Sequence, residues 1–179
     1  MGALAAMSGG TLVQGSADTR IATVSTDSRE LGQDCVFIPI AGEKFNGHDF
    51  LESLIRDKQI AGYLTHEMIP SGNNKETAVI TCADTLRALG NIASAHRNAV
   101  DPTVIGITGT NGKTTTKELL WTILSAQYRC LKNEKNYNNE IGLPFTLLQL
   151  EATHEMAVVE MGMNHHGEID RLTAIARPD

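Results

Sequence analysis

The chain has 179 residues, of which 41% are hydrophobic and 20% charged, with a formal net charge of −6 at pH 7. This composition is typical of a globular chain and excludes a disordered one. The negative charge also argues against the basic surface that non-specific nucleic-acid binding requires, so we expect no nucleic-acid partner.

The cysteines and the apolar segments indicate the cellular compartment. Cys35, Cys82 and Cys130 are far apart and odd in number, which predicts buried, reduced thiols rather than disulfides or a zinc site. No apolar stretch approaches the roughly 20 residues needed to cross a bilayer, and residues 1–10 lack the basic start of a signal peptide. We expect a cytoplasmic protein without a membrane partner.

The first hundred residues predict a small mixed α/β domain. Hydrophobic periodicity and turn residues give the following elements: a helix at 3–7 that Ser8-Gly9-Gly10 ends, strands at 20–24 and 35–40, a helix at 48–58, strands at 60–64 and 78–81, and a helix that Asp84 caps.

The pattern changes at Val100-Asp101-Pro102, because proline stops the preceding helix and a new strand begins at once. We place the domain boundary here, with one domain at 1–100 and a second at 101–179. The second domain alternates strands at 103–108, 128–131 and 156–160 with helices at 114–126, 143–150 and 168–176. This alternation predicts a parallel sheet with helices on both faces.

The last residues suggest an incomplete sheet. Arg177-Pro178-Asp179 follows a helix at the point where another parallel strand would begin, and open α/β sheets usually have more than three strands. The expected fold is therefore α/β, a small mixed N-terminal domain followed by a truncated parallel-sheet domain that carries a phosphate-binding loop.

A phosphate-binding loop is predicted between the strand at 103–108 and the helix at 114–126. The segment Ile105-Gly106-Ile107-Thr108-Gly109-Thr110-Asn111-Gly112-Lys113-Thr114-Thr115 lies between an apolar strand and a helix start. Glycines let backbone N–H groups turn toward phosphate oxygens, and the helix N-terminus adds partial positive charge. We expect Lys113 to neutralise the β- and γ-phosphates of a nucleotide and Thr114 to ligate Mg²⁺.

The loop departs from the general pattern G-x-x-x-x-G-K-[ST], which has glycine where this chain has Ile107. The alternative is a glycine-rich turn followed by a surface lysine. The flanking strand and helix favour the nucleotide site, whose expected nucleotide-binding residues are Thr108, Gly109, Thr110, Asn111, Gly112, Lys113, Thr114 and Thr115.

Glu160 is the second candidate metal ligand. It ends the strand at 156–160, and the carboxyl ends of parallel strands share one edge of the sheet, where ligands bind. A carboxylate there would hold the same Mg²⁺ as Thr114. The alternative is a solvated glutamate at a strand end.

Two further loops leave the same sheet edge. The asparagine-rich loop at 136–142 is explained equally well by turn formation and by ligand contact. His165 and His166 are adjacent, which disfavours joint ligation of one ion, so we expect exposed loop histidines.

Trp121 is expected to pack in the core and Cys130 to be inert.

Three segments together resemble the Mur ligase family. The family's ATP loop is similar to the segment Ile107-Thr108-Gly109-Thr110-Asn111-Gly112-Lys113-Thr114-Thr115, and this similarity accounts for the shifted glycines. Two further motifs, of the family member that adds D-Ala-D-Ala, resemble the segments Asn136-Tyr137-Asn138-Asn139-Glu140-Ile141-Gly142-Leu143-Pro144 and Glu160-Met161-Gly162-Met163-Asn164. Thr26-Asp27-Ser28-Arg29 and the segment 37–50 resemble the family's UDP-sugar-binding domain.

The resemblance implies an ATP- and Mg²⁺-dependent amide ligase of peptidoglycan synthesis. Its substrates would be UDP-N-acetylmuramoyl-tripeptide and D-Ala-D-Ala, joined through an acyl phosphate, with Lys113 and Asn139 near the reacting centre. The UDP group would contact Ser28, Arg29, Asn46, Gly47 and His48. Since the family's amine-binding domain lies beyond this sequence, we expect the 179-residue chain alone to be inactive, and a monomer.

Three alternatives stay open from the sequence. A MurE-type ligase or a folylpolyglutamate synthase would share the same loop, and a generic P-loop nucleotide-binding protein would leave the first hundred residues unexplained. A third alternative is a module that binds only the UDP substrate. For Asp27-Ser28-Arg29, the residues by themselves favour a self-bonded turn with a surface arginine.

Overall fold

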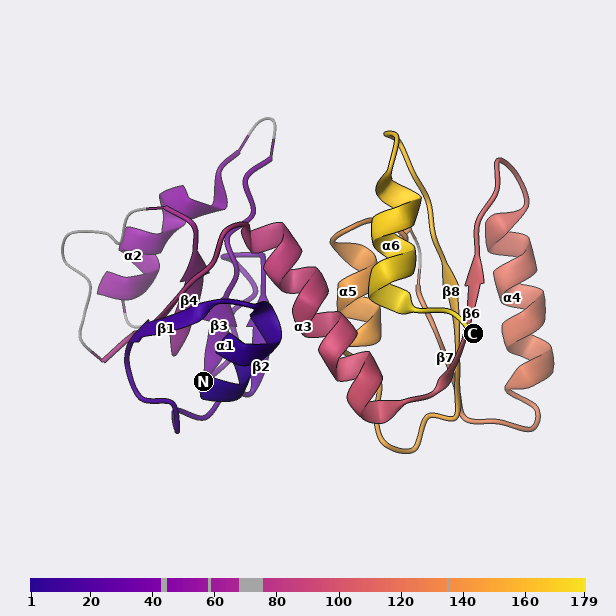
Figure 1. Cartoon of the computed structure of the whole chain (residues 1–179), viewed down its shortest axis with the longest axis horizontal. Coiled ribbons are helices and arrows are strands. Elements are labelled where there is room, and N and C mark those ends of the chain that lie inside the picture. Colours follow the sequence, from indigo (N-terminus) through magenta and orange to yellow (C-terminus); the bar gives the residue numbers. More distant parts are fainter. Residues whose placement is uncertain (43–44, 58, 68–75, 135) are drawn as a thin grey trace. The chain divides into compact units, whose positions relative to one another are not determined.

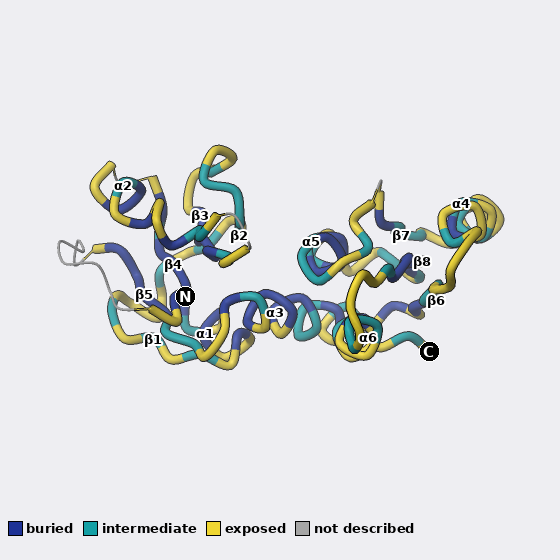
Figure 2. Tube along the Cα trace, turned by 90° about the horizontal axis from the view of Figure 1, so that it is seen from above, coloured by how far each residue is buried: buried dark blue, intermediate teal, exposed yellow. Residues whose placement is uncertain are grey.

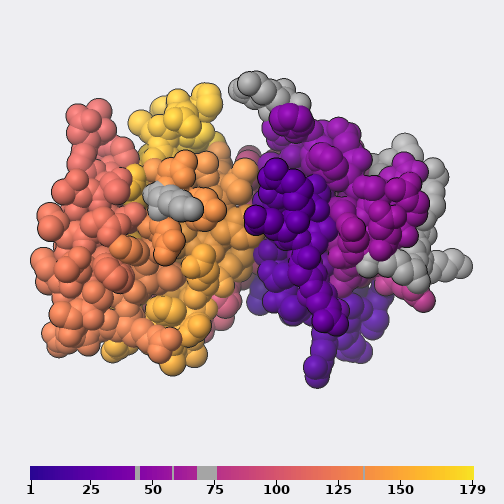
Figure 3. Space-filling model, turned by 180° about the vertical axis from the view of Figure 1, so that it is seen from behind, coloured from indigo at the N-terminus to yellow at the C-terminus, as the bar shows by residue number. Residues whose placement is uncertain are grey.

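The computed structural model describes residues 1–42, 45–57, 59–67, 76–134 and 136–179, and the other residues are grey in Figure 3. The described chain forms two compact units, Met1–Leu89 and Gly90–Asp179. Glu43, Lys44 and Lys58, which belong to segments named above, lie outside the described residues.

The first unit contains a five-stranded sheet with the order β1-β5-β4-β3-β2. All neighbours are parallel except β1 and β5, which pair antiparallel with Thr11 opposite Thr81. In chain order its elements are α1 (Gly2–Ser8), β1 (Thr11–Gln14), β2 (Thr23–Ser25), β3 (Cys35–Phe37), the 3₁₀ turn η1 (Gly47–Phe50), α2 (Leu51–Arg56), β4 (Gly62–Thr65) and β5 (Ala78–Thr81).

A small apolar core holds α2 against this sheet. Leu51, Leu54 and Ile55 of α2 pack with Phe37 of β3 and Tyr63 of β4, and all five are buried. The spacing of the three α2 residues places them on one helix face. Burial raises the pKa of Tyr63 to about 12, and its buried hydroxyl has no hydrogen-bond partner among the described residues.

α3 (Thr85–Val100) begins in the first unit and ends in the second. Asp84 caps it, as predicted, by accepting a hydrogen bond from the backbone N–H of Arg87 at 2.9 Å. The compact units divide within this helix, at Leu89, and not at the boundary expected at Val100-Asp101-Pro102. The reason is that Ala93, in the second half of α3, packs in the core of the second unit.

The second unit contains a three-stranded parallel sheet with the order β6-β8-β7, which confirms the predicted parallel α/β arrangement. Ile107 lies opposite Glu160 in the register, so β6 and β8 end together. The elements are β6 (Thr103–Ile107), α4 (Lys113–Leu124), β7 (Cys130–Lys132), α5 (Gly142–Leu147), β8 (Met156–Glu160) and α6 (Glu168–Ala176).

Helices cover both faces of this sheet. Figures 1 and 2 show α4 on one side of the strands and α5 and α6 on the other. Leu143 and Leu147 of α5 and Leu172 of α6 are fully buried against Val159 of β8. Burial of these side chains stabilises the α5 and α6 face, at about 1.5–3 kcal/mol for each large aliphatic side chain.

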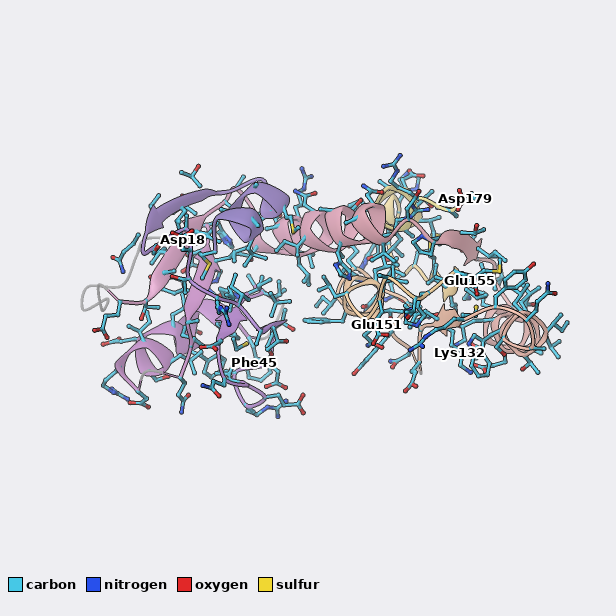
Figure 4. All side chains as sticks on the ribbon, turned by 90° about the horizontal axis from the view of Figure 1, so that it is seen from below. Asp18, Phe45, Lys132, Glu151, Glu155 and Asp179 are labelled. Atoms are coloured by element: carbon cyan, nitrogen blue, oxygen red, sulfur yellow. The ribbon has the colours of Figure 1, made fainter. Side chains whose placement is uncertain are left out.

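On the opposite face, polar contacts tie α4 to β7. The indole nitrogen of Trp121 donates to the carbonyl of Cys130 at 2.9 Å. Trp121 is half-buried, so it is not fully enclosed in a core as expected. The Lys132 ammonium lies 3.9 Å from the centre of the Trp121 ring and pairs with Glu118. Figure 4 shows Lys132 beside α4, and this pairing lowers the pKa of Glu118.

The cysteines are free thiols, and burial raises the pKa of all three, which favours the unreactive protonated form. Among the helices that the structure describes, none combines the length and the apolar character that a membrane span requires.

Candidate functional site

The loop between β6 and α4 has the conformation that its glycines permit. Gly109 has φ 145° and Gly112 has φ 78°, both in the region that residues with a Cβ rarely adopt. Gly112 is the N-cap of α4, so the chain turns from the strand end into the helix within five residues, 108–112. The predicted strand, turn and helix are confirmed, and the turn leads into a helix N-terminus suited to bind an anion.

Lys113 is the first residue of α4, and its side chain folds back over this loop. Its ammonium donates to the carbonyl oxygen of Gly109 at 2.6 Å. The positive charge therefore lies above the turn and beside the N-terminus of α4. A phosphate bound there would replace this neutral acceptor with a charged one, which forms a stronger hydrogen bond.

A pocket of about 620 Å³ opens next to the loop. The loop and the segment before α6 form its walls, and its lining residues are Thr108, Gly109, Thr110, Lys113, Met163, His166, Gly167, Ile169 and Asp170. Four predicted nucleotide-binding residues are thus in the lining, whereas Asn111, Gly112, Thr114 and Thr115 are outside it. The volume falls in the usual range of small-molecule sites, about 300–1,000 Å³.

Glu160 meets the loop from the end of β8. Its carboxylate accepts a hydrogen bond from the Thr114 hydroxyl at 2.8 Å and another from the Asn138 amide at 2.8 Å. The residue is only 3% exposed, so it is not a solvated strand-end glutamate. A buried carboxylate needs such partners, because an unpaired buried charge is costly.

The Thr114 and Glu160 pair has the chemistry of a Mg²⁺ site. Both residues offer hard oxygen donors, which Mg²⁺ prefers, and Mg²⁺ usually takes only one or two protein ligands. The observed Thr114–Glu160 hydrogen bond brings these oxygens together across 46 positions of sequence. The residues therefore fit the ion that the sequence predicted.

The asparagine-rich loop forms the predicted turn and also bonds Glu160, while its contact with a ligand stays a prediction. The Asn139 side-chain oxygen accepts from the N–H groups of Ile141 and Gly142, at 3.2 and 2.8 Å, and so caps the start of α5. Asn138, its neighbour, bonds the Glu160 carboxylate. Asn138 thus bonds a candidate metal ligand, while Asn139, the residue expected near the reacting centre, is exposed and bonds the start of α5.

The segment before α6 is braced by Glu168. This carboxylate accepts from the N–H groups of Asn164 and His165, at 2.6 and 3.1 Å, and lies 3.1 Å from the His165 ring nitrogen Nδ1. These bonds lower the pKa of Glu168 to about 2. His165 is exposed, as expected, whereas the equally exposed His166 lines the pocket.

In the first unit, Arg29 and Asp27 form an exposed two-point ion pair. The Arg29 guanidinium donates to both Asp27 oxygens, at 2.9 and 2.6 Å, and these bonds lower the pKa of Asp27 to about 2. The self-bonded turn favoured by the residues alone is therefore present. Ser28 and Arg29 also line an open pocket of about 500 Å³, together with Leu31, Gly32, Gln33 and Gln59.

The other predicted substrate residues form a separate cluster. The Asn46 side chain accepts from the backbone N–H of His48 at 3.1 Å, lies 2.8 Å from its ring Nδ1, and donates to Glu67 at 2.9 Å. Gly47 begins η1. Burial lowers the pKa of His48, so its ring is neutral at pH 7. Asn46, Gly47 and His48 do not line the pocket of Ser28 and Arg29.

His48, His66 and Glu67 also lie close enough to one another to hold a metal ion. The Asn46 amide, however, already bonds both His48 and Glu67. We therefore interpret this group as a hydrogen-bonded cluster that holds Asn46 and His48 at the start of η1. The buried His48 Nε2 has no hydrogen-bond partner among the described residues.

Three polar residues of the site were not among the predicted site residues: Asn138, His166 and Asp170. Asn138 belongs to a loop that was predicted to reach this edge, but its side-chain direction depends on the tertiary structure. No sequence pattern distinguishes a histidine or an aspartate that lines a pocket from one that faces solvent.

Two family models match the chain. The model described as "Mur ligase family, catalytic domain" matches residues 20–97, and the "Mur ligase middle domain" matches residues 107–179. The first range covers most of the first compact unit and extends into α3, and the second lies within the second unit and includes the loop, Glu160 and the pocket.

Named relatives agree with these models. The chain is 45% identical over 161 residues to the UDP-N-acetylmuramoyl-tripeptide–D-alanyl-D-alanine ligase of Bacillus subtilis, covering 90% of this chain and 35% of the relative. It is 36% identical over 163 residues to the ligase of the same name in Escherichia coli, covering 91% and 35%. The chain thus spans about a third of the length of these relatives.

Solved structures share the fold. A crystal structure of MurF from Acinetobacter baumannii aligns with a TM-score of 0.87 at 35% identity, covering 98% of this chain and 38% of that one. The MurF ligase of Thermotoga maritima in complex with ADP aligns with a TM-score of 0.77 at 29% identity, covering 89% and 36%. With both of its compact units matched by models and relatives of one family, the chain belongs to the Mur ligase family.

Proposed function

We propose that this chain is the substrate- and ATP-binding part of a MurF-type ligase, which joins D-Ala-D-Ala to UDP-N-acetylmuramoyl-tripeptide in peptidoglycan synthesis. The observation that carries the proposal is the hydrogen bond between Thr114 and Glu160 beside the glycine loop. It is supported by the 45% identity to the Bacillus subtilis ligase. A MurE-type ligase is the alternative within the family.

The pocket beside the loop is proposed to take ATP. The N–H groups at the start of α4 and the Lys113 ammonium would bind the phosphates, with Thr108, Gly109, Thr110, Asn111, Gly112 and Thr115 around them. Thr114 and Glu160 would hold Mg²⁺. The ion would supply positive charge that offsets the charge of the phosphate tail. The Thermotoga maritima relative was solved in complex with ADP, which supports the binding of an adenine nucleotide.

The proposed reaction has two steps. A carboxylate oxygen of the tripeptide attacks the γ-phosphorus of ATP, so a new O–P bond forms, the bond to the β-phosphate oxygen breaks, and ADP leaves. The amine of D-Ala-D-Ala then attacks the acyl carbon, loses a proton, and releases phosphate as the amide bond forms. Two anions meet in the first step, and Lys113 would reduce their repulsion.

The first unit is proposed to bind the UDP group through Ser28, Arg29, Asn46, Gly47 and His48, and Asn139 is proposed to lie near the reacting centre. The exposed guanidinium of Arg29 is available to a diphosphate if it exchanges its bond with Asp27.

D-Ala-D-Ala would bind in the part of the ligase that this chain does not cover, so the chain alone should release no phosphate. We also propose a cytoplasmic monomer.

Calorimetry tests the two binding assignments separately. The chain is titrated with Mg·ATP and, in a second experiment, with UDP-N-acetylmuramoyl-tripeptide carrying lysine or diaminopimelate. Binding of both ligands is expected. Binding of ATP alone would favour a generic nucleotide-binding protein, whereas binding of the UDP-tripeptide alone would favour a substrate-binding module.

Lys113→Ala tests the phosphate site in a full-length ligase that carries this sequence. We expect the loss of phosphoryl transfer, measured as D-Ala-D-Ala-dependent phosphate release, because no other described ammonium lies in the pocket lining. Thr116→Ala, at an exposed position one turn further along α4, is the control and should keep normal turnover. Normal turnover in Lys113→Ala would contradict the assignment.

A further inference from the structure

A buried asparagine outside the predicted site holds the backbone of Glu160. Asn133 follows the last residue of β7 and is 0% exposed. Its side-chain oxygen accepts from the Glu160 N–H at 2.9 Å, and its amide nitrogen donates to the Glu160 carbonyl at 3.0 Å. The side chain therefore bonds both backbone groups of Glu160 where the ladder between β7 and β8 ends.

The same amide also fixes the neighbouring loop. The Asn133 nitrogen makes a second bond, to the carbonyl of Tyr137, at 2.9 Å. Tyr137 immediately precedes Asn138, whose amide bonds the Glu160 carboxylate. With two donated bonds and one accepted bond, the Asn133 side chain uses both of its N–H donors, and few other side chains of this size could replace it.

Lys117 connects Asn133 to α4. Its ammonium donates to the Asn133 carbonyl at 2.7 Å, and the residue is 1% exposed. Lys117 lies one helical turn after Thr114, whose hydroxyl bonds Glu160. A closed ring of contacts thus joins α4 to the ends of β7 and β8, and it runs through Thr114, Glu160, Asn133 and Lys117.

We propose that Asn133 is a positioning residue for the metal ligands Glu160 and Thr114, and that Lys117 holds Asn133 in place. Asn133 bonds the backbone of Glu160, and Lys117 bonds Asn133 one helical turn after Thr114, so both act through the two metal ligands. Groups that orient metal ligands typically contribute about 10- to 100-fold to metal affinity. The inference rests on the proposed function, because it assumes that Glu160 and Thr114 hold Mg²⁺ with the nucleotide.

The test measures how ADP binding to the chain depends on Mg²⁺. ADP is titrated calorimetrically at a series of Mg²⁺ concentrations and in EDTA, for Asn133→Ala and for the control Asn136→Ala, an exposed asparagine of the same loop. Asn133→Ala should raise the half-saturating Mg²⁺ concentration by about tenfold or more. ADP affinity in EDTA should match the control, which a general disturbance of the loop would not allow.

Other outcomes are equally decisive. The same Mg²⁺ dependence in Asn133→Ala and Asn136→Ala would overturn the inference. If Asn133→Ala does not fold, Lys117→Met, which removes the bond to the Asn133 carbonyl, is measured instead, and it should shift the Mg²⁺ dependence in the same direction. No shift there would also overturn it.

The unmodified chain and Glu160→Gln separate this inference from the proposed function. Failure of the unmodified chain to bind Mg·ADP, or an unchanged Mg²⁺ dependence in Glu160→Gln, would overturn the nucleotide site and the inference with it. A Glu160-dependent Mg²⁺ effect that Asn133→Ala leaves intact would overturn the inference alone.

Discussion

At the scale of single residues, Glu160 shows what a sequence motif leaves open. Its position at a strand end predicted a ligand, and the structure adds its partners, Thr114 and Asn138, which come from two other segments. The resemblance to the family, and not a pattern in the residues themselves, pointed to Asn139 rather than Asn138. The direction of each side chain depends on how the loop is anchored, and the sequence does not encode that locally.

Glu168 gives a prediction for the dependence of stability on pH. Its pKa in the folded chain is about 2, below the ordinary value of 4.5, so its bonds stabilise the fold above about pH 4.5. This contribution is lost as the pH falls toward 2 and the carboxylate takes up a proton. The free energy of unfolding of Glu168→Gln should therefore be lower than that of the unmodified chain at pH 7, with the difference shrinking as the pH falls from 5 to 2.

Urea denaturation at a series of pH values measures this difference. The exposed Glu30→Gln is the control for the loss of a surface carboxylate. A Glu168→Gln difference that stays constant between pH 7 and pH 3 would show that the carboxylate does not brace the segment before α6.

At the scale of elements, periodic segments were predicted well and short edge strands were not. The predicted bounds of β5, β8 and α6 are confirmed. β1 was missed, because Thr11–Gln14 is short, only partly buried, and paired with a strand almost 70 residues later. β3 was expected to reach residue 40 but ends at Phe37. The helix at 48–58 is a 3₁₀ turn followed by α2, with residue 58 outside the described chain.

α5 depends on the close approach of the loop before it. A Cβ at Gly142 would lie 2.5 Å from the Tyr137 Cα, a backbone atom that no side-chain movement can clear. Gly142→Ala should therefore displace the loop that carries Asn138 and lower the free energy of unfolding by about 1–3 kcal/mol. It should also weaken Mg²⁺-dependent ADP binding.

Thermal unfolding and ADP calorimetry measure these two effects. Gly32→Ala is the matched control, because a Cβ at Gly32 meets nothing closer than 3.8 Å. Stability and Mg²⁺-dependent binding in Gly142→Ala equal to those of the control would contradict the packing argument.

At the scale of the whole molecule, each compact unit has its own core. Leu54 belongs to the core beneath α2 and Leu147 to the core beneath α5, and the two clusters share no residue. Leu54→Ala and Leu147→Ala should each cost about 2–5 kcal/mol, but in different units. Amide exchange should rise mainly in Met1–Leu89 for Leu54→Ala and mainly in Gly90–Asp179 for Leu147→Ala.

Hydrogen exchange followed by mass spectrometry resolves the two units by peptide. The two variants serve as controls for each other. Equal increases in both units from either substitution would show that the described chain unfolds as one cooperative body.

The sequence by itself determined the parallel α/β class of the second unit, the phosphate loop and the position of Glu160 at a strand end. These follow from local patterns, namely periodic apolar residues, glycines before a helix, and a lysine followed by threonine. Only the tertiary structure decided that Asn138 and Asn133 bond Glu160 and that Lys117 bonds Asn133. It also decided that the compact units divide within α3. Such contacts join residues distant in sequence, and their geometry depends on how the elements pack.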